Sequence, residues 1–178
     1  MVMVDDQHLP AGDFSSWLVD VRAAIRGERP AVVPCDDCTA CCTSSQFVHI
    51  EPDEADTLGC IPSGLLFPAP GRPRGHVVLG YDDRGHCPML VEGRCSIYAH
   101  RPRSCRMYDC RVFAATGVPP EGDGRAAIAR QVKRWRFDDS SVKAKAQQEA
   151  VRAAVTFLQG RSADGTQLAV RAIMHAGG

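Results

Sequence analysis

The chain has 178 residues, of which 44% are hydrophobic and 24% are charged, as is typical of a globular protein with one core. Its 21 basic and 21 acidic residues cancel, so charge gives no argument for a nucleic-acid or membrane-surface partner. The first residues, MVMVDDQHLPAGDF, lack the basic and apolar regions of a secretory signal, and no stretch approaches the roughly 18 apolar residues of a membrane span. We therefore expect a cytoplasmic protein that forms a single domain over residues 1–178.

Helical patterns occur at both ends of the chain. They cover residues 14–26, 125–137, 140–160 and 166–176. Asp13 or Ser15 is placed to cap the first of these helices, and Ser140 or Ser141 to cap the third. No cysteine occurs in the last third of the chain, and we interpret residues 125–176 as a helical C-terminal region.

The middle of the chain has short strand patterns broken by turns. We predict a strand at 47–50, one or two helical turns at 52–58, a loop at 62–75 and a short helix that starts at Pro102. The segments 76–81, 87–91 and 95–98 predict a small antiparallel meander. The predicted fold class is α+β: a small cysteine-rich, metal-centred domain with a short antiparallel sheet and flanking helices, whose metal-binding core spans residues 35–110.

Eight of the nine cysteines lie in two groups, CDDCTACC and CPMLVEGRCSIYAHRPRSCRMYDC. They are Cys35, Cys38, Cys41, Cys42, Cys87, Cys95, Cys105 and Cys110. A cytoplasmic compartment keeps thiols reduced, and a bond between the neighbours Cys41 and Cys42 would be strained, so disulfides fit poorly. A single catalytic thiol leaves the other seven unexplained, and the pattern of a buried apolar cysteine suits only Cys60. We therefore interpret both groups as metal ligands.

The spacing within the first group bears on the choice of metal. A CxxC pair can hold one tetrahedral ion in a tight turn, as in zinc sites. Cys35, Cys38 and Cys41 extend this pair to CxxCxxC, the three-ligand run of bacterial ferredoxin-type clusters, and this run favours a [4Fe–4S] cluster over zinc. Because neighbouring side chains diverge, Cys41 and Cys42 are awkward ligands for one ion. Two centres, one polynuclear cluster and a spare thiol remain as alternatives.

Arginine residues surround the second group of cysteines. They are Arg94, Arg101, Arg103, Arg106 and Arg111. Four thiolates around a divalent ion or an oxidised four-iron cluster leave a net charge of about −2. We therefore expect these arginines to donate hydrogen bonds to the sulfurs or to pair with nearby carboxylates. His86 and His100 also lie close to cysteines in the sequence, and we expect them to face solvent or to cap a turn.

Together the two groups resemble a known family. CDDCTACC, followed by CPML, EG and RCSIYAHRPRSCRMYDC, is similar to the YkgJ-type cysteine-cluster family of zinc- or iron-chelating domains. That family shows CxxCxxCC and then a segment of the form CP-x-L…G-x-C-x-IY-x-x-RP-x-x-CR-x-Y-x-C. The resemblance covers residues 35–110 and implies that the eight grouped cysteines are the family positions, with Cys60 outside the motif.

We expect the protein to bind an iron–sulfur cluster or zinc through its cysteines. One alternative is a structural zinc module whose helical C-terminal third binds another protein. Another is an accessory or maturation factor for peptide or protein modification. The sequence shows no acid–base pair or substrate pocket, so it leans against an enzyme. The expected partners are the metal or cluster and another protein, with no nucleic acid and no membrane.

Overall fold

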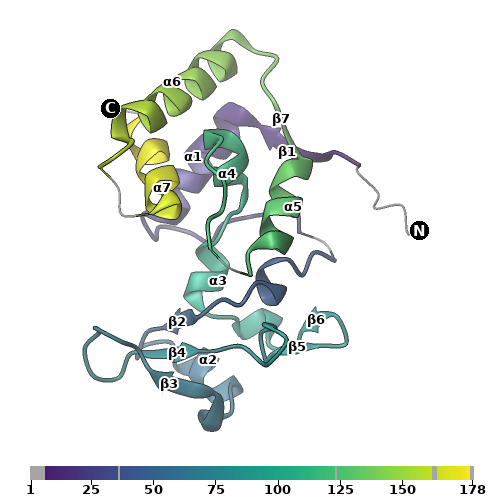
Figure 1. The fold of residues 1–178 in the computed structure, drawn as a ribbon, viewed down its shortest axis with the longest axis vertical. Coiled ribbons are helices and arrows are strands. Elements are labelled where there is room, and N and C mark those ends of the chain that lie inside the picture. Colours follow the sequence, from purple (N-terminus) through teal and green to yellow (C-terminus); the bar gives the residue numbers. More distant parts are fainter. Residues whose placement is uncertain (1–6, 36, 123, 162–163, 177–178) are drawn as a thin grey trace. The chain divides into compact units, whose positions relative to one another are not determined.

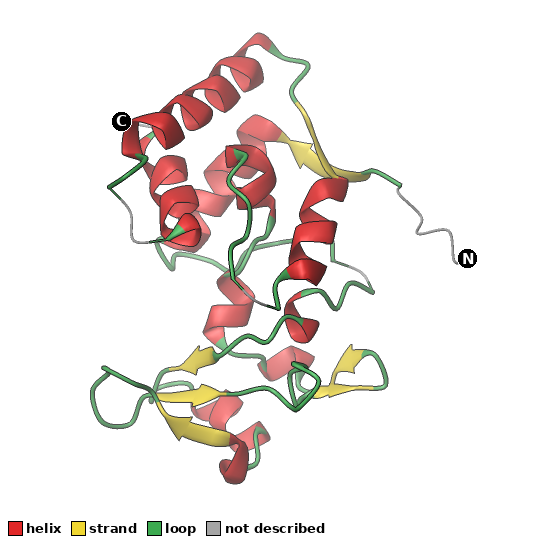
Figure 2. Cartoon of the chain, in the orientation of Figure 1, coloured by secondary structure: helices red, strands yellow, loops and turns green. Residues whose placement is uncertain are grey.

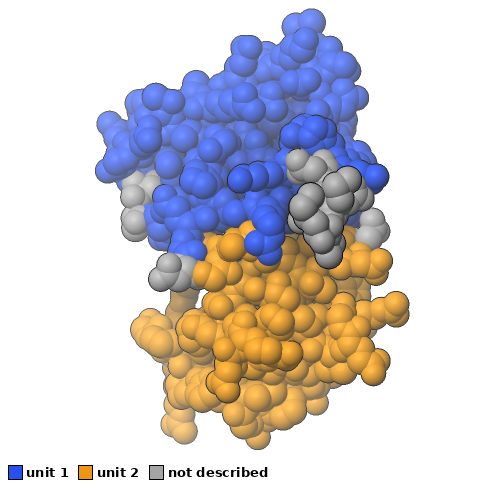
Figure 3. Space-filling model, turned by 45° about the vertical axis from the view of Figure 1, so that its right-hand side comes forward, with its two compact units in different colours: residues 1–34, 109–122, 128–178 blue, residues 35–108, 123–127 orange. Residues whose placement is uncertain are grey.

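The computed structural model describes residues 7–35, 37–122, 124–161 and 164–176 (Figure 1). Helices and short antiparallel sheets occur together in it, which confirms the α+β class (Figure 2). The chain divides into two compact units, coloured blue and orange in Figure 3. Unit 1 comprises residues 1–34, 109–122 and 128–178, and unit 2 comprises residues 35–108 and 123–127. The single domain expected from the sequence stays a prediction.

Most of unit 1 consists of the two ends of the chain. Its elements are β1 (Leu9–Asp13), α1 (Phe14–Ile25), α4 (Arg111–Thr116), most of α5 (Ala126–Arg134), β7 (Trp135–Asp138), α6 (Val142–Leu158) and α7 (Gly165–His175). The apolar faces of α1, α6 and α7 are buried, with Phe14, Val151 and Ile173 inaccessible to solvent. Among the described residues, no helix has both the length and the apolar composition that crossing a membrane requires.

Two helices of unit 1 begin at the caps expected from the sequence. The Asp13 carboxylate accepts a hydrogen bond from the N–H of Ser16 at 2.8 Å and begins α1. The Ser141 hydroxyl accepts one from the N–H of Ala144 at 3.0 Å and begins α6. Each cap satisfies an N–H group that the first turn of a helix leaves without an intrahelical partner. Local sequence signals therefore placed both helix starts correctly.

Residues 135–137, expected to continue a helix, instead form a strand. The helix α5 ends at Arg134, and β7 pairs in parallel with β1, with Leu9 opposite Trp135. The segment WRFD alternates apolar and polar residues, so an extended chain turns Trp135 and Phe137 to the same side. Phe137 packs against Trp17 with 4.6 Å between the ring centroids. Pairing with β1 and aromatic packing thus override the helical pattern of the preceding residues.

Unit 1 contains a buried ion pair. The side chains of Arg111 and Asp109 are only 8% and 2% exposed, and Nη2 of the arginine lies 2.8 Å from Oδ2 of the aspartate. The indole N–H of Trp17 donates to the same carboxylate at 2.9 Å. The guanidinium also donates to the carbonyl groups of Ala11 and Val32. One arginine therefore links β1, the segment after α1 and the start of α4.

We predict that Arg111→Met destabilises the protein, because the Asp109 carboxylate would stay buried without its positive partner. Breaking a buried pair from one side lowers the free energy of unfolding by about 3–5 kcal/mol, which urea denaturation would measure. Arg26→Met removes the arginine of the exposed pair with Glu28 and should leave the unfolding midpoint almost unchanged. Equal effects of the two substitutions would contradict the prediction.

Unit 2 contains the middle of the chain. Its elements are the 3₁₀ turn η1 (Cys41–Thr43), β2 (Val48–Ile50), α2 (Ala55–Cys60), η2 (Ser63–Leu65), β3 (Leu66–Pro68), β4 (Val77–Leu79), β5 (Leu90–Val91), β6 (Arg94–Cys95), η3 (Tyr98–His100) and α3 (Arg103–Met107). The strands β2, β4 and β3 form an antiparallel sheet in that order, and β5 pairs with β6 in a separate hairpin. The strand expected at 47–50 and the short helix expected after Pro102 are both present.

The sheet of unit 2 differs from the predicted meander. Strand β4 lies between β2 and β3 rather than beside β5, and β3 falls in the segment 62–75 that we expected to be a loop. Pro68 is tolerated because β3 lies at an edge of the sheet. Ile50 of β2 and Leu79 of β4 are buried in one hydrophobic cluster. Pairing these two strands lets both side chains reach the same core, which a meander limited to residues 76–98 does not provide.

Candidate metal centre

The first cysteine group is a tight turn held by its own polar groups. The N–H of Cys38 donates to the carbonyl of Cys35 at 2.6 Å. The hydroxyl of Ser44, which is 1% exposed, donates to the carbonyl of Ala40 at 2.5 Å. Local hydrogen bonds, rather than a sheet or a long helix, therefore shape the segment that carries these thiols.

Backbone hydrogen bonds join the two cysteine groups. The N–H of Cys87 donates to the carbonyl of Cys42 at 2.7 Å, and the N–H of Ser45 donates to the carbonyl of Gly85 at 2.9 Å. Gly85 has a φ of +78°, and a Cβ at this position would lie 2.3 Å from the Ser45 hydroxyl. Glycine is therefore needed for this close approach. As a result, Cys42 and Cys87 are neighbours although they are far apart in the sequence.

Cys87 and Cys95 lie at the border of the hydrophobic core. Both are partly buried and pack against the apolar cluster of unit 2. Cys95 is opposite Leu90 in the β5–β6 hairpin, and the N–H of Leu90 donates to the carbonyl of Cys87 at 2.9 Å. The hairpin turn uses Glu92 and Gly93, both at positive φ, as tight two-residue turns require. The hairpin therefore fixes the position of Cys95 relative to Cys87.

Helix α3 carries Cys105, and a buried carboxylate holds the start of this helix. The Glu54 side chain is 2% exposed. Its Oε2 accepts a hydrogen bond from the N–H of Arg103, the first residue of α3, at 2.5 Å. Its Oε1 accepts one from the N–H of Glu51 at 2.9 Å, and the guanidinium of Arg106 lies 3.8 Å away. One carboxylate therefore ties α3 to the segment that follows β2.

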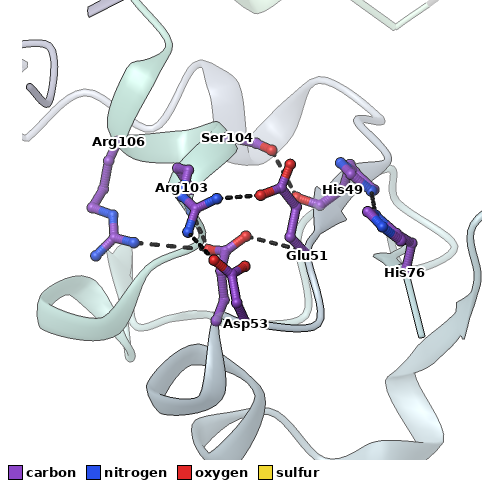
Figure 4. A network of polar contacts seen from close by, with 8 residues as sticks. His49, Glu51, Asp53, His76, Arg103, Ser104 and Arg106 are labelled. Carbon is purple, nitrogen blue, oxygen red and sulfur yellow. Dashed lines mark hydrogen bonds and ion pairs between the residues drawn. The ribbon is translucent and has the colours of Figure 1, made fainter. Parts of the chain in front are cut away.

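Figure 4 shows further contacts that hold α3 in place. The Arg103 guanidinium pairs with the carboxylate of Glu51 and, at 2.9 Å, with that of Asp53. The hydroxyl of Ser104 donates to the carbonyl of His49 at 2.7 Å. Each contact joins α3 to β2 or to the turn after it. The position of Cys105 therefore depends on a polar network and not only on apolar packing.

The arginines and histidines near the cysteines differ in their contacts and exposure. Arg106 and Arg111 pair with carboxylates, one of the two roles expected for the arginines. Arg101 lies over an aromatic ring, 4.1 Å from its centroid. His100 is exposed and His86 is partly buried. The positive charge around the second group is thus largely engaged by carboxylates of the protein.

Thiols from both groups interact electrostatically. They belong to Cys35, Cys38, Cys42, Cys87, Cys95 and Cys105. Burial, and then repulsion from four of the other thiols, raises the pKa of Cys42 to about 11. Although Cys105 is an exposed residue, the protein atoms around its thiol and then repulsion from three of these thiols raise its pKa to about 12, and Arg101 acts in the opposite direction. Burial also raises the pKa of Cys87 above its ordinary value. These sulfurs are therefore close enough to repel one another as thiolates.

The remaining cysteines have different surroundings. Cys41 is exposed in η1. Cys110 lies in unit 1, where it is buried and accepts a hydrogen bond from the indole N–H of Trp135 at 3.2 Å. Cys60 is exposed at the end of α2, whereas we expected it to be at least partly buried, because the next residue, Ile61, enters the core instead. The ligand roles of Cys41 and Cys110, like those of the other six grouped cysteines, stay predictions.

The chemistry of the gathered thiols fits a thiophilic metal. In the described ranges, no three histidine, cysteine, aspartate or glutamate side chains have the spacing of a metal shell. The side chains that interact across the two cysteine groups are nevertheless all thiols, and soft thiolate ligands select zinc, copper(I) or iron–sulfur clusters over hard cations. Mutual repulsion of the kind that raises the pKa of Cys42 is also what a bound cation relieves. The residues therefore fit zinc or an iron–sulfur cluster.

Two features of this region were not predicted from the sequence. One is Glu54, whose position three residues after Glu51 is the spacing of a capping box, in which an acidic side chain reaches back to a backbone N–H. That local signal was available in the sequence. The other is the pair of His49 and His76, whose Nε2 and Nδ1 atoms lie 2.9 Å apart. No local pattern indicated this pair, because only the pairing of β2 with β4 brings the two rings together.

Comparison with known proteins agrees with the geometry of the cysteine groups. Residues 34–121 match the model of the CxxCxxCC family, described as a "putative zinc- or iron-chelating domain". The matched segment contains both cysteine groups. No curated protein and no solved structure matches the chain. The match confirms the resemblance to this family that was predicted from the cysteine spacing.

Proposed function

We propose that the protein is a cytoplasmic metal-binding protein that chelates an iron–sulfur cluster or zinc through both cysteine groups. The candidate ligands in unit 2 are Cys35, Cys38, Cys41, Cys42, Cys87, Cys95 and Cys105. Cys110 stays a candidate from the sequence. The observation that carries the proposal is that thiols from both groups interact electrostatically. The backbone hydrogen bond from Cys87 to Cys42 joins the two groups in the same place.

The raised pKa values support metal binding for a physical reason. A thiol with a pKa of about 11, such as that of Cys42, stays protonated at neutral pH and is inert as a nucleophile. A catalytic thiol requires the opposite shift. A metal ion or cluster deprotonates its cysteine ligands outright, because its positive charge offsets both the burial of the thiolates and their repulsion.

Between the two metals, the spacing of the first group favours a [4Fe–4S] cluster. Cys35, Cys38 and Cys41 form the CxxCxxC run that such clusters use, with a further ligand from elsewhere in the chain. A cluster would supply one-electron redox chemistry, whereas zinc would supply a structural cross-link. In either case the residues of unit 2 hold the thiols and exclude water from Cys42 and Cys87, which are partly buried.

The first test of the proposal is metal content after purification without oxygen. We predict a brown protein with absorption near ~400 nm and acid-labile sulfide. Cys42→Ser and Cys105→Ser should lose most of the metal, because each removes a thiol of the interacting set. Cys60→Ser, which changes an exposed cysteine at the end of α2, is the matched control and should keep it.

Different outcomes of this experiment separate the alternatives. A colourless protein with stoichiometric zinc that is lost in Cys42→Ser would indicate that the proposed ligands bind zinc and not a cluster. Full metal retention in both Cys42→Ser and Cys105→Ser would overturn the proposal that the two cysteine groups act together.

A further prediction concerns Glu54, which holds α3 through backbone N–H groups and the guanidinium of Arg106. Glu54→Gln keeps the size of the side chain but removes the charge that faces Arg103 and Arg106. Loss of a group that orients a ligand typically weakens metal affinity by about 10- to 100-fold, and competition with a chromophoric chelator would measure this loss. Asp56→Asn, which changes an exposed acidic residue of α2, is the control and should leave the affinity unchanged. Equal affinities of the Gln variant and the unchanged protein would refute the role of Glu54.

The third prediction is a steep pH dependence of metal affinity. Because the pKa values of Cys42 and Cys105 are about 11 and about 12, both thiols must lose a proton when they bind metal near neutral pH. The apparent association constant should therefore fall about tenfold for each such thiol with each unit of decreasing pH between about 9 and 6. Calorimetry in buffers of different ionisation enthalpy would count the released protons. Release of fewer than one proton for each metal bound would contradict this prediction.

A further inference from the structure

Two histidine rings of unit 2 face each other outside the cysteine groups. Nε2 of His49 and Nδ1 of His76 lie 2.9 Å apart, and the two rings are parallel to within 1° (Figure 4). At this distance one ring nitrogen donates a proton and the other accepts it. At least one of the two facing nitrogens therefore carries a lone pair.

The sheet places both rings on the face opposite the hydrophobic core. His49 is opposite Val78 in the β2–β4 ladder, and His76 precedes Val78 by two residues, so the two histidines are diagonal neighbours on one face. The other face carries Ile50 and Leu79, which are buried. Both histidines are only partly buried, so each is accessible to solvent in part.

The charge around the histidine pair favours a cation. Figure 4 shows the acidic network that adjoins it. Three carboxylates belong to this network, and two guanidinium groups oppose them. The carboxylates are Glu51, Asp53 and Glu54, and the guanidinium groups are Arg103 and Arg106. One negative charge is therefore in excess beside the pair, and Asp53 is close enough to His76 for the two to interact electrostatically.

The distance between the nitrogens also suits a shared metal ion. Two metal–nitrogen bonds of about 2.0–2.1 Å place the nitrogens about 3.3 Å apart at the tetrahedral angle of zinc and about 2.9 Å apart at a right angle. The two ring nitrogens, 2.9 Å apart, therefore need to separate by no more than about 0.5 Å to share one ion. Rotation of a histidine ring about its Cβ–Cγ bond is a soft motion, so both lone pairs can turn toward one ion on the solvent side without a change in the strands.

We propose that His49 and His76 form a second site, independent of the cysteines, for one divalent transition-metal ion such as zinc. The imidazole nitrogens supply two ligands, and water completes the shell. Imidazole is a ligand that zinc, copper and nickel share, whereas the thiol groups select softer centres. This site does not rest on the proposed iron–sulfur or zinc centre of the two cysteine groups.

The test uses the full-length reduced protein and zinc. Equilibrium dialysis should show one more zinc bound to the unchanged protein than to His49→Ala or His76→Ala. His8→Ala and His175→Ala, which change histidines of unit 1, are matched controls and should keep the extra zinc. Cys105→Ser should also keep it, which separates this site from the cysteine centre.

A spectroscopic measurement shows whether the rings themselves bind the ion. In protein with ¹⁵N-labelled histidine, zinc should shift the NMR signals of Nε2 of His49 and Nδ1 of His76, and not those of His8 or His175. Equal zinc stoichiometry in the unchanged protein and in His49→Ala would overturn the proposal. Shifts at only one of the two rings would also overturn it, because a shared ion must contact both.

Discussion

The geometry of unit 2 depends most on the buried carboxylate of Glu54. A buried charge is costly unless hydrogen bonds and an opposite charge compensate it. Here both oxygens accept backbone N–H groups, from Glu51 and Arg103, and Arg106 lies close by. These donors come from segments far apart in the sequence, so the carboxylate is stable only when α3 lies against the end of β2. Since α3 has only five residues and is too short to be stable alone, its position follows from this anchor.

The thiolates have neighbours whose effect is opposite to that of the groups around the Glu54 carboxylate. Glu54 meets N–H groups and a guanidinium, whereas Cys42 and Cys105 meet other thiols. The charge of the neighbouring groups sets the sign of the interaction, so the carboxylate is stabilised and the thiolates repel one another. Unit 2 therefore brings the thiols together by backbone hydrogen bonds and side-chain contacts made elsewhere. In the proposed centre, a bound metal would relieve this repulsion, and the free energy of metal binding would thereby be coupled to folding of unit 2.

The parts of the fold that the sequence predicted have local signals. The helices α1 and α6 follow from apolar periodicity and from caps three residues before the N–H they bind. The missed parts depend on partners distant in sequence. Strand β7 exists because β1 is beside it, and β4 lies between β2 and β3 because Ile50 and Leu79 share a core. The cysteine spacing predicted the candidate ligands, but it did not predict that Glu54 reaches α3 or that Cys110 lies in unit 1 beside Trp135.

The two cysteine groups are held by supports of different strength. Cys87 and Cys95 pack against the core of unit 2 and belong to a hairpin segment, and Cys105 lies on the helix anchored by Glu54. The first group depends mainly on a local turn and on the hydrogen bond from Cys87 to Cys42. A segment with few buried apolar contacts opens at a lower free energy than a packed one. The second group is therefore the more preorganised part of the proposed site. In that proposal, closure of the first group onto a metal would be the step at which binding free energy orders the chain.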